Sequence, residues 1–139
     1  MARASDQSAS ETQRLILDSG AVISLARNEK RAHIYLLRAL ELNTSVEIPS
    51  VVLAETVRGG AKDAPIHRVL KLVGKIPPTT EMHGRVAGEL LGKARSSSTV
   101  DALIVAHAVL GGGAVILTGD PGDLGQLAAR HPEVMVRPL

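Results

Sequence analysis

The sequence predicts an α/β domain with a mostly parallel central sheet, and three observations support this fold class. Short apolar segments alternate with helical patterns along the chain, as strands and crossover helices do in parallel sheets. The chain is 45% hydrophobic but has no Trp, no Phe and one Tyr, so small aliphatic side chains must form its core. Such side chains suit a sheet that helices cover on both faces. At 139 residues without an internal repeat, the chain has the length of one domain.

The first predicted strand is the apolar run 14–17, which polar residues bound on both sides. A helical period begins at Ser19 and places three residues on one face: Val22, Leu25 and Ala26. A second helix lies between the breaks at Asn28 and Asn43. Apolar residues recur along it at Ile34, Leu37 and Leu40, with Tyr35 and Leu42 nearby.

The middle of the chain continues this alternation. A second strand is predicted at 46–49, and Ser50 is suited to cap a helix over 51–57 that Gly59 and Gly60 end. Pro65 can open the next helix, which has an apolar face and ends at Gly74. A weak third strand follows at 75–77, and its proline favours an edge position.

The last third contains the longest apolar patterns. Thr79 or Thr80 is expected to cap a helix over 81–95, with Met82, Val86, Leu90 and Leu91 on its core face. Thr99 is expected to cap a nearly all-apolar, buried helix over 100–110. Three glycines end that helix, and the remaining elements are a strand at 114–117, a short helix at 124–129 and a strand at 134–136.

Composition excludes several classes of protein. The absence of cysteine excludes a disulfide framework, a thiolate zinc site and a cysteine nucleophile. No apolar run reaches the roughly 20 residues of a membrane span, and the polar residues 1–13 do not resemble a signal peptide. We expect those residues to be a disordered leader before a domain at 14–139 in a cytoplasmic protein. The net charge of +2 permits a nucleic-acid partner without requiring one.

Acidic residues at the ends of apolar segments are the candidate functional groups. Asp18 follows the first strand, Asp120 and Asp123 follow the clearest strand, and Glu55 and Asp101 lie in apolar helices. Each has a structural explanation on its own: Asp18 as a helix cap, Asp101 as a partner of the helix dipole, Glu55 as a solvated helix residue, and the other two as turn formers. Because ligands bind beyond the carboxyl ends of parallel strands, Asp18 and Asp120 are placed where a site is expected.

The surroundings of these acids favour a metal site. A charge among apolar residues is costly without a partner, and basic residues near the acids are sparse apart from Arg58. Carboxylates that meet without cations repel one another and take up protons. A divalent cation removes this conflict, and oxygen ligands favour Mg²⁺ or Mn²⁺ over zinc. The five histidines show no ligand spacing, and His107 is better explained as a satisfied core residue or a helix-end group.

Four segments in this order resemble the PIN domain family, and within it the VapC toxins of bacterial VapBC toxin–antitoxin systems. The segments are 17–21, 49–59, 99–106 and 116–124. The resemblance implies a three-layer α/β/α fold. It also implies that Asp18, Asp101 and Asp120 bind the metal directly, that Glu55 acts through a metal-bound water, and that Asp123 is a possible further ligand.

The same resemblance implies supporting roles near these acids. Thr118 stands at the position of the family's supporting hydroxyl, and Ser19 and Arg58 are candidates for support or for substrate binding. Where the family commonly has Ser or Asn before its fourth acid, this chain has Gly119. We also consider that Arg58 pairs with Glu55.

The implied activity is that of a Mg²⁺-dependent endoribonuclease that cuts tRNA or ribosomal RNA and inhibits translation, with Mn²⁺ able to substitute. The implied partners are the RNA substrate, a cognate VapB antitoxin and a second copy of the chain, in a homodimer or a larger complex with antitoxin, without a membrane. In this mechanism Glu55 orients or deprotonates the attacking water.

Two other functions stay open at this point. One is a catalytically degenerate PIN-type module that binds RNA or a partner; the presence of all four acids argues against it. The other is a receiver-like phosphoacceptor domain, which also has acids at strand ends. The absence of a lysine after Leu117 argues against that alternative.

Overall fold

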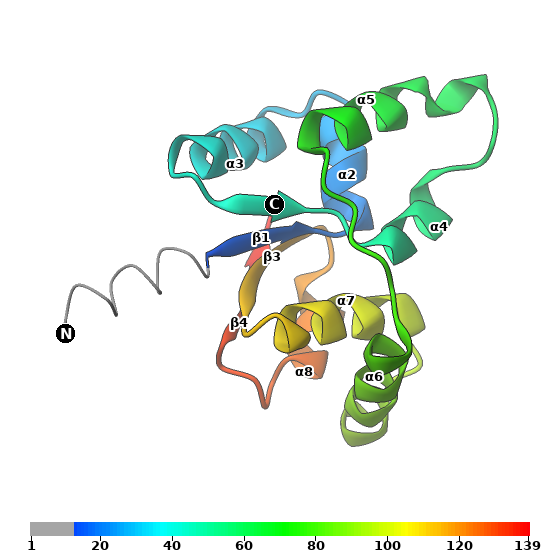
Figure 1. Cartoon of the computed structure of the whole chain (residues 1–139), viewed down its shortest axis with the longest axis vertical. Coiled ribbons are helices and arrows are strands. Elements are labelled where there is room, and N and C mark those ends of the chain that lie inside the picture. The colour runs from blue at the N-terminus through cyan, green and yellow to red at the C-terminus, as the bar shows by residue number, and fades with distance from the viewer. Residues whose placement is uncertain (1–12) are drawn as a thin grey trace.

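The computed structural model describes residues 13–139, and within them the chain forms a central sheet of four parallel strands (Figure 1). The strands are β1 (Arg14–Leu17), β2 (Ser45–Glu47), β3 (Ala114–Thr118) and β4 (Val134–Pro138), in the order β2-β1-β3-β4. Leu15 pairs with Val46 on one side and with Val115 on the other. Because all strands run in one direction, their carboxyl ends share one edge of the sheet, which we call the carboxyl edge.

Helices cover both faces of the sheet, so the predicted three-layer α/β/α architecture is confirmed (Figure 1). On one side lie α2 (Ser19–Ala26), α3 (Lys30–Glu41) and α5 (Ala64–Val73). On the other side lie α6 (Glu81–Ala94), α7 (Thr99–Leu110) and α8 (Pro121–Leu127). Between β2 and α5 the chain forms the 3-10 turn η1 (Ser50–Val52), the short helix α4 (Leu53–Thr56) and the 3-10 turn η2 (Ala61–Asp63).

The core consists of branched aliphatic side chains, as the composition predicts. Ile16, Leu17, Ile116 and Leu117 are fully buried in the two central strands, and Ile104 of α7 is buried with them. This apolar layer carries the residues that follow β1 and β3 to the carboxyl edge. The side chains at that edge are therefore fixed by the two most buried strands of the sheet.

The third strand predicted at 75–77 is not a strand in the structure. The carbonyls of Lys75 and Pro77 accept hydrogen bonds from the amides of Ile48 (3.0 Å) and Ser50 (2.9 Å), so the segment lies beside the end of β2. Pro77 and Pro78 have no N–H to donate in return. The pairing is therefore one-sided, and a regular ladder does not form.

Several predicted helix ends are also corrected. Ser50 opens a 3-10 turn instead of capping an α-helix, and its hydroxyl pairs with Thr79 (3.1 Å). Thr80 does cap α6, in a reciprocal arrangement with His83. Thr99 is the first residue of α7, with Ser98 at its N-cap position. The last helix begins three residues before the predicted start, at Pro121, a residue type that favours a first helical turn.

The apolar residues that recur along α3 face solvent. Ile34 and Leu37 are each 58% exposed and Leu40 is 50% exposed, whereas Ala32, Leu36 and Ala39 are buried. Helical spacing predicts one apolar face, but α3 has two, and the one against the core consists of two alanines and Leu36. Ile34, Leu37 and Leu40 form the second, exposed apolar face, which we call the α3 face.

Two expectations concern other parts of the chain. The prediction of a disordered leader at 1–13 lies outside the described residues, except for Gln13. None of the helices within 13–139 has the length and hydropathy that crossing a membrane requires.

Candidate metal centre

Asp18 follows β1 directly and is 5% exposed. Its amide donates to the carbonyl of Leu117 (3.2 Å), and its Oδ1 accepts the amide of Ala21 (2.9 Å) at the start of α2. Burial raises the pKa of the Asp18 carboxyl, although hydrogen bonds from Thr118, Ala21 and Gly119 act in the opposite direction. The residue is therefore a helix cap and also a carboxylate held at the carboxyl edge by two central strands.

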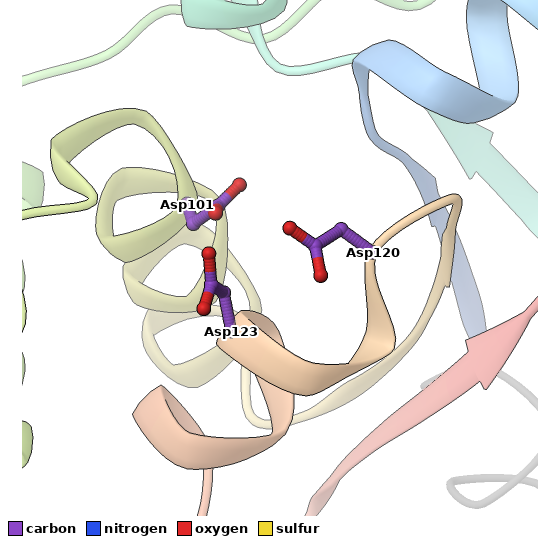
Figure 2. A group of neighbouring side chains, drawn as sticks. All are labelled: Asp101, Asp120 and Asp123. Carbon is purple, nitrogen blue, oxygen red and sulfur yellow. The ribbon is translucent and has the colours of Figure 1, made fainter.

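Three further acids gather beside it. Carboxylate oxygens of Asp101, Asp120 and Asp123 lie within 4.8 Å of one another. Figure 2 shows these side chains pointing toward one another from the first turn of α7, the loop after β3 and the first turn of α8. The structure thus brings Asp123 into the same group as two of the predicted ligands.

The pKa of the Asp101 carboxyl shows that the four other acids lie within its electrostatic reach. Burial, together with the negative charges of four neighbours, raises the pKa of its carboxyl to about 6; the neighbours are Asp18, Glu55, Asp120 and Asp123. Among residues 13–139, none of these five acids is in an ion pair. The acids therefore lie close enough to repel one another, and no cation of residues 13–139 forms an ion pair that would offset the repulsion.

Glu55 reaches this group from α4. Its Oε1 accepts a hydrogen bond from the hydroxyl of Ser19, the residue that follows Asp18. Ser19 thereby joins α2 to α4 and directs Glu55 toward Asp18. The charge of Glu55 also acts on the pKa values of both Asp18 and Asp101.

Thr118 connects two of the acids through its buried hydroxyl. Its Oγ1 accepts the amide of Asp120 (2.7 Å), and its side chain hydrogen-bonds to Asp18. A threonine at the end of β3 therefore fixes the loop that carries Asp120 and orients the acid at the end of β1. The supporting role expected for Thr118 at a metal site stays a prediction.

The ends of β1 and β3 approach each other closely through two glycines. A Cβ atom on Gly20 would lie 3.0 Å from the amide nitrogen of Gly119, a contact that real side chains avoid. A Cβ atom on Gly119 would lie 3.6 Å from the Cα of Gly20, an ordinary van der Waals contact. The close approach therefore favours glycine at position 20, where a side chain would push the two loops apart by a few tenths of an ångström, whereas position 119 has room for a small side chain.

Arg58 does not form an ion pair with any acid in the described part of the chain. Its guanidinium donates to the carbonyls of Ala54 (3.0 Å), Val57 (3.2 Å) and Glu55 (3.3 Å). These carbonyls end α4, so Arg58 satisfies helix-end groups that otherwise lack partners. Its expected pairing with Glu55 is replaced by a bond to that residue's main chain.

The donor set fits Mg²⁺ or Mn²⁺ on chemical grounds. It contains carboxylate oxygens and hydroxyls but no histidine or sulfur donor, and hard divalent cations prefer oxygen. Burial, together with the charges of four acids, raises the pKa of the Asp101 carboxyl, and a bound cation would offset both effects. Asp101, Asp120 and Asp123 are the closest group, and Asp18 borders it from β1.

Three solved structures share the fold at low sequence identity. They are FitAcB from Neisseria gonorrhoeae, VapBC2 from Rickettsia felis bound to a DNA fragment from their promoter, and DNA-bound VapBC from Salmonella typhimurium. Their TM-scores are 0.62, 0.67 and 0.61, with identities of 20%, 18% and 20%. The matches cover 88%, 90% and 91% of this chain and 95%, 98% and 98% of the matched chains.

A comparison with curated protein sequences gave no significant match. The profile of the PIN domain family, in contrast, matches residues 15–129, which include every acid of the candidate centre. By this match the chain belongs to the PIN domain family.

Proposed function

We propose that this protein is a metal-dependent endoribonuclease and the toxin of a toxin–antitoxin pair. The observation that carries this proposal is the group of acids at the carboxyl edge, none of which forms an ion pair within residues 13–139. Membership of the PIN domain family supports the nuclease part and replaces the receiver-like alternative.

In this proposal Asp18, Asp101 and Asp120 hold Mg²⁺ or Mn²⁺, and Asp123 contributes a further oxygen. A bound divalent ion would lower the pKa of a coordinated water and neutralise negative charge on the phosphodiester. Glu55, held by the Ser19 hydroxyl, accepts a proton from the attacking water. Thr118 keeps Asp18 and Asp120 in place. The substrate class we propose is tRNA or ribosomal RNA, so cleavage would inhibit translation in the cytoplasm.

The α3 face supports the partner proposal. Ile34, Leu37 and Leu40 expose large apolar side chains on one helix, an arrangement typical of a surface that another chain covers. We propose that a VapB-type antitoxin covers this face and that a second copy of the chain completes a homodimer or a larger complex. Resemblance to chains from toxin–antitoxin structures agrees with this partner class.

The direct test of the nuclease proposal is RNA cleavage by purified wild-type protein and by Asp18→Asn. Asparagine retains an oxygen that can accept the Ala21 amide and is itself a good helix cap, so the variant should keep its fold. We expect Mg²⁺-dependent cleavage by the wild type that EDTA stops, and no cleavage by Asp18→Asn. Equal cleavage by the two proteins, or cleavage in EDTA, would contradict the proposal.

A further inference from the structure

Asp63 is a buried acid that lies outside the candidate metal centre. It is 4% exposed and ends the turn η2, five residues after Arg58. Its carboxylate accepts main-chain amides from the loop that follows α4: Arg58 at 2.9 Å and Gly59 at 2.7 Å. The Gly59 hydrogen bond is the largest cause of a lowered pKa for the Asp63 carboxyl, which is therefore an anion at neutral pH.

The loop that Asp63 binds has a conformation that glycine makes possible. Gly59 has φ +92°, a value that residues with a side chain rarely adopt. This turn directs two successive amides toward one carboxylate, an arrangement that binds anions well. A single side chain thereby fixes both residues that leave α4.

Arg58 extends this fixation back into the helix. Its main-chain amide binds Asp63, while its guanidinium binds the carbonyls of Ala54, Glu55 and Val57. Helix α4 has only four residues and cannot be stable by itself. Its carboxyl end is held by Arg58, and Arg58 is held by Asp63.

Glu55 lies within this short helix, three residues before Arg58. Its carboxylate meets the Ser19 hydroxyl on one side, and its main-chain carbonyl accepts the Arg58 guanidinium on the other. We infer that Asp63 is a positioning residue for Glu55 and acts through the main chain of Arg58 and Gly59. This inference rests on the proposed function, in which Glu55 serves the attacking water.

The test compares RNA cleavage by wild type, Asp63→Ala and Asp63→Asn with a matched control, Glu41→Ala, an exposed acid at the end of α3. Misplacement of a reacting group by about 1 Å can cost roughly 100-fold in rate. We expect Asp63→Ala to lower kcat by roughly 10- to 100-fold with KM for RNA nearly unchanged. Asp63→Asn keeps one acceptor oxygen and should lie between wild type and alanine, and Glu41→Ala should match wild type.

A double-mutant cycle with Glu55→Gln distinguishes positioning from general loss of stability. If Asp63 acts through Glu55, Asp63→Ala should cause little further loss of kcat when Glu55 is already glutamine. An equal loss in both backgrounds would overturn the inference. So would wild-type kcat in a folded Asp63→Ala protein.

Amide hydrogen exchange separates failure of this inference from failure of the proposed function. The amides of Arg58 and Gly59 should exchange slowly in the wild type and fast in Asp63→Ala, while amides of β1 and β3 stay protected. Unchanged exchange at Arg58 and Gly59 would overturn the inference whether or not the protein cuts RNA. Absence of cleavage by the wild type, with the expected exchange pattern, would refute the nuclease and leave Asp63 as the anchor of α4.

Discussion

Two groups of charged residues in this molecule lie in opposite electrostatic environments. At the carboxyl edge, Asp101 has four acids within electrostatic reach, and burial with their charges raises its pKa to about 6. On the α7 side of β2, the carboxylate of Glu47 is 6% exposed and meets cations and donors: the Arg14 guanidinium at 3.1 Å and His107 at 2.7 Å. Burial alone would raise the pKa of Glu47, but hydrogen bonds and charges from His107 and Arg14 lower it to about 2.

The difference separates an acid that is paired with cations and donors from acids that repel one another. Glu47 is part of a closed network in which His107 also bonds to His83 (2.9 Å), and His83 bonds to the cap residue Thr80. That network joins β1, β2, α6 and α7 and favours the folded state. The acids of the carboxyl edge, in contrast, destabilise the folded state because they repel one another. Their position is one in which they could coordinate a cation.

The largest effect we expect is loss of activity at the carboxyl edge. Asp120→Asn removes a charge from the closest acid group and should lower RNA cleavage by roughly a thousandfold or more. The Thr118 hydroxyl bonds the main chain of Asp120, so the loop should keep its place. Single-turnover assays with Mg²⁺ measure the change, and Glu47→Gln at a temperature where it is folded serves as the control. Cleavage by Asp120→Asn within tenfold of wild type would contradict its role as a ligand.

The second prediction is loss of stability in the Glu47 network. Glu47→Gln leaves the largely buried Arg14 guanidinium without its anion, and breaking a pair of this kind costs about 3 kcal/mol. Urea unfolding at pH 7.5 measures the change in the free energy of unfolding. A loss below about 1 kcal/mol would mean that the network contributes no more than a surface ion pair.

The third prediction is that Asp101→Asn, unlike Glu47→Gln, raises the stability of the protein. An aspartate whose pKa is raised in the folded state resists ionisation there, so it lowers stability once the pH rises above the unfolded pKa near 4 and most above about 6. Because Asp101 is partly exposed, we expect Asp101→Asn to be more stable by only about 1 kcal/mol at pH 7.5 in EDTA. Near pH 4 the two proteins should be about equal.

The same variant tests the alternative explanation of Asp101. If this acid only complemented the dipole of α7, its replacement would lower stability by a few tenths of a kcal/mol. Thermal unfolding of wild type and Asp101→Asn in EDTA at pH 4 and pH 7.5 distinguishes the two. Lower stability of the variant at pH 7.5 would contradict the account of repelling acids.

The smallest effect concerns His83. Burial, with the neighbouring His107, lowers the pKa of the His83 imidazole, so the folded state binds its proton less readily than the unfolded state. The stability that neutral His83 contributes is present above its ordinary pKa near 6.5 and is lost as the pH falls below it. When the pH is lowered from 7.5 to 5.5, the free energy of unfolding should therefore fall less in His83→Gln than in wild type. His33→Gln is the control and should behave like wild type. An equal fall in His83→Gln and wild type would remove His83 from this role.

Sequence patterns predicted most of the sheet and the residues of its carboxyl edge. Asp18 and Asp120 follow strands, and the shared direction of those strands was enough to place them at one edge. Glu55 and Asp101 were candidates as acids within apolar helices, and the resemblance to the family assigned their roles. His107 was expected as a satisfied core residue or a helix-end group; it is partly buried in the last turn of α7 and bonds to Glu47 and His83. Whether these acids bind a metal stays a prediction.

Other features depend on contacts that spacing cannot show. The Arg14–Glu47 pair joins residues 33 positions apart, and its signal was a charge at the end of each of two apolar strands. Spacing along α3 could not indicate which of its two apolar faces meets the core, because the buried face consists mainly of small alanines. The failure of the strand at 75–77 follows from prolines that cannot return hydrogen bonds to β2.

The central claim is that the acids of the carboxyl edge hold a divalent cation. Isothermal titration of Mn²⁺ into metal-free protein at pH 7.5 tests it most directly, on wild type, Asp101→Asn and the control Glu47→Gln at a temperature where all three are folded. We expect saturable binding to wild type and Glu47→Gln and greatly weakened binding to Asp101→Asn. No binding to folded wild type, or equal binding to wild type and Asp101→Asn, would contradict it, and absence of binding would favour a PIN-type module without catalysis.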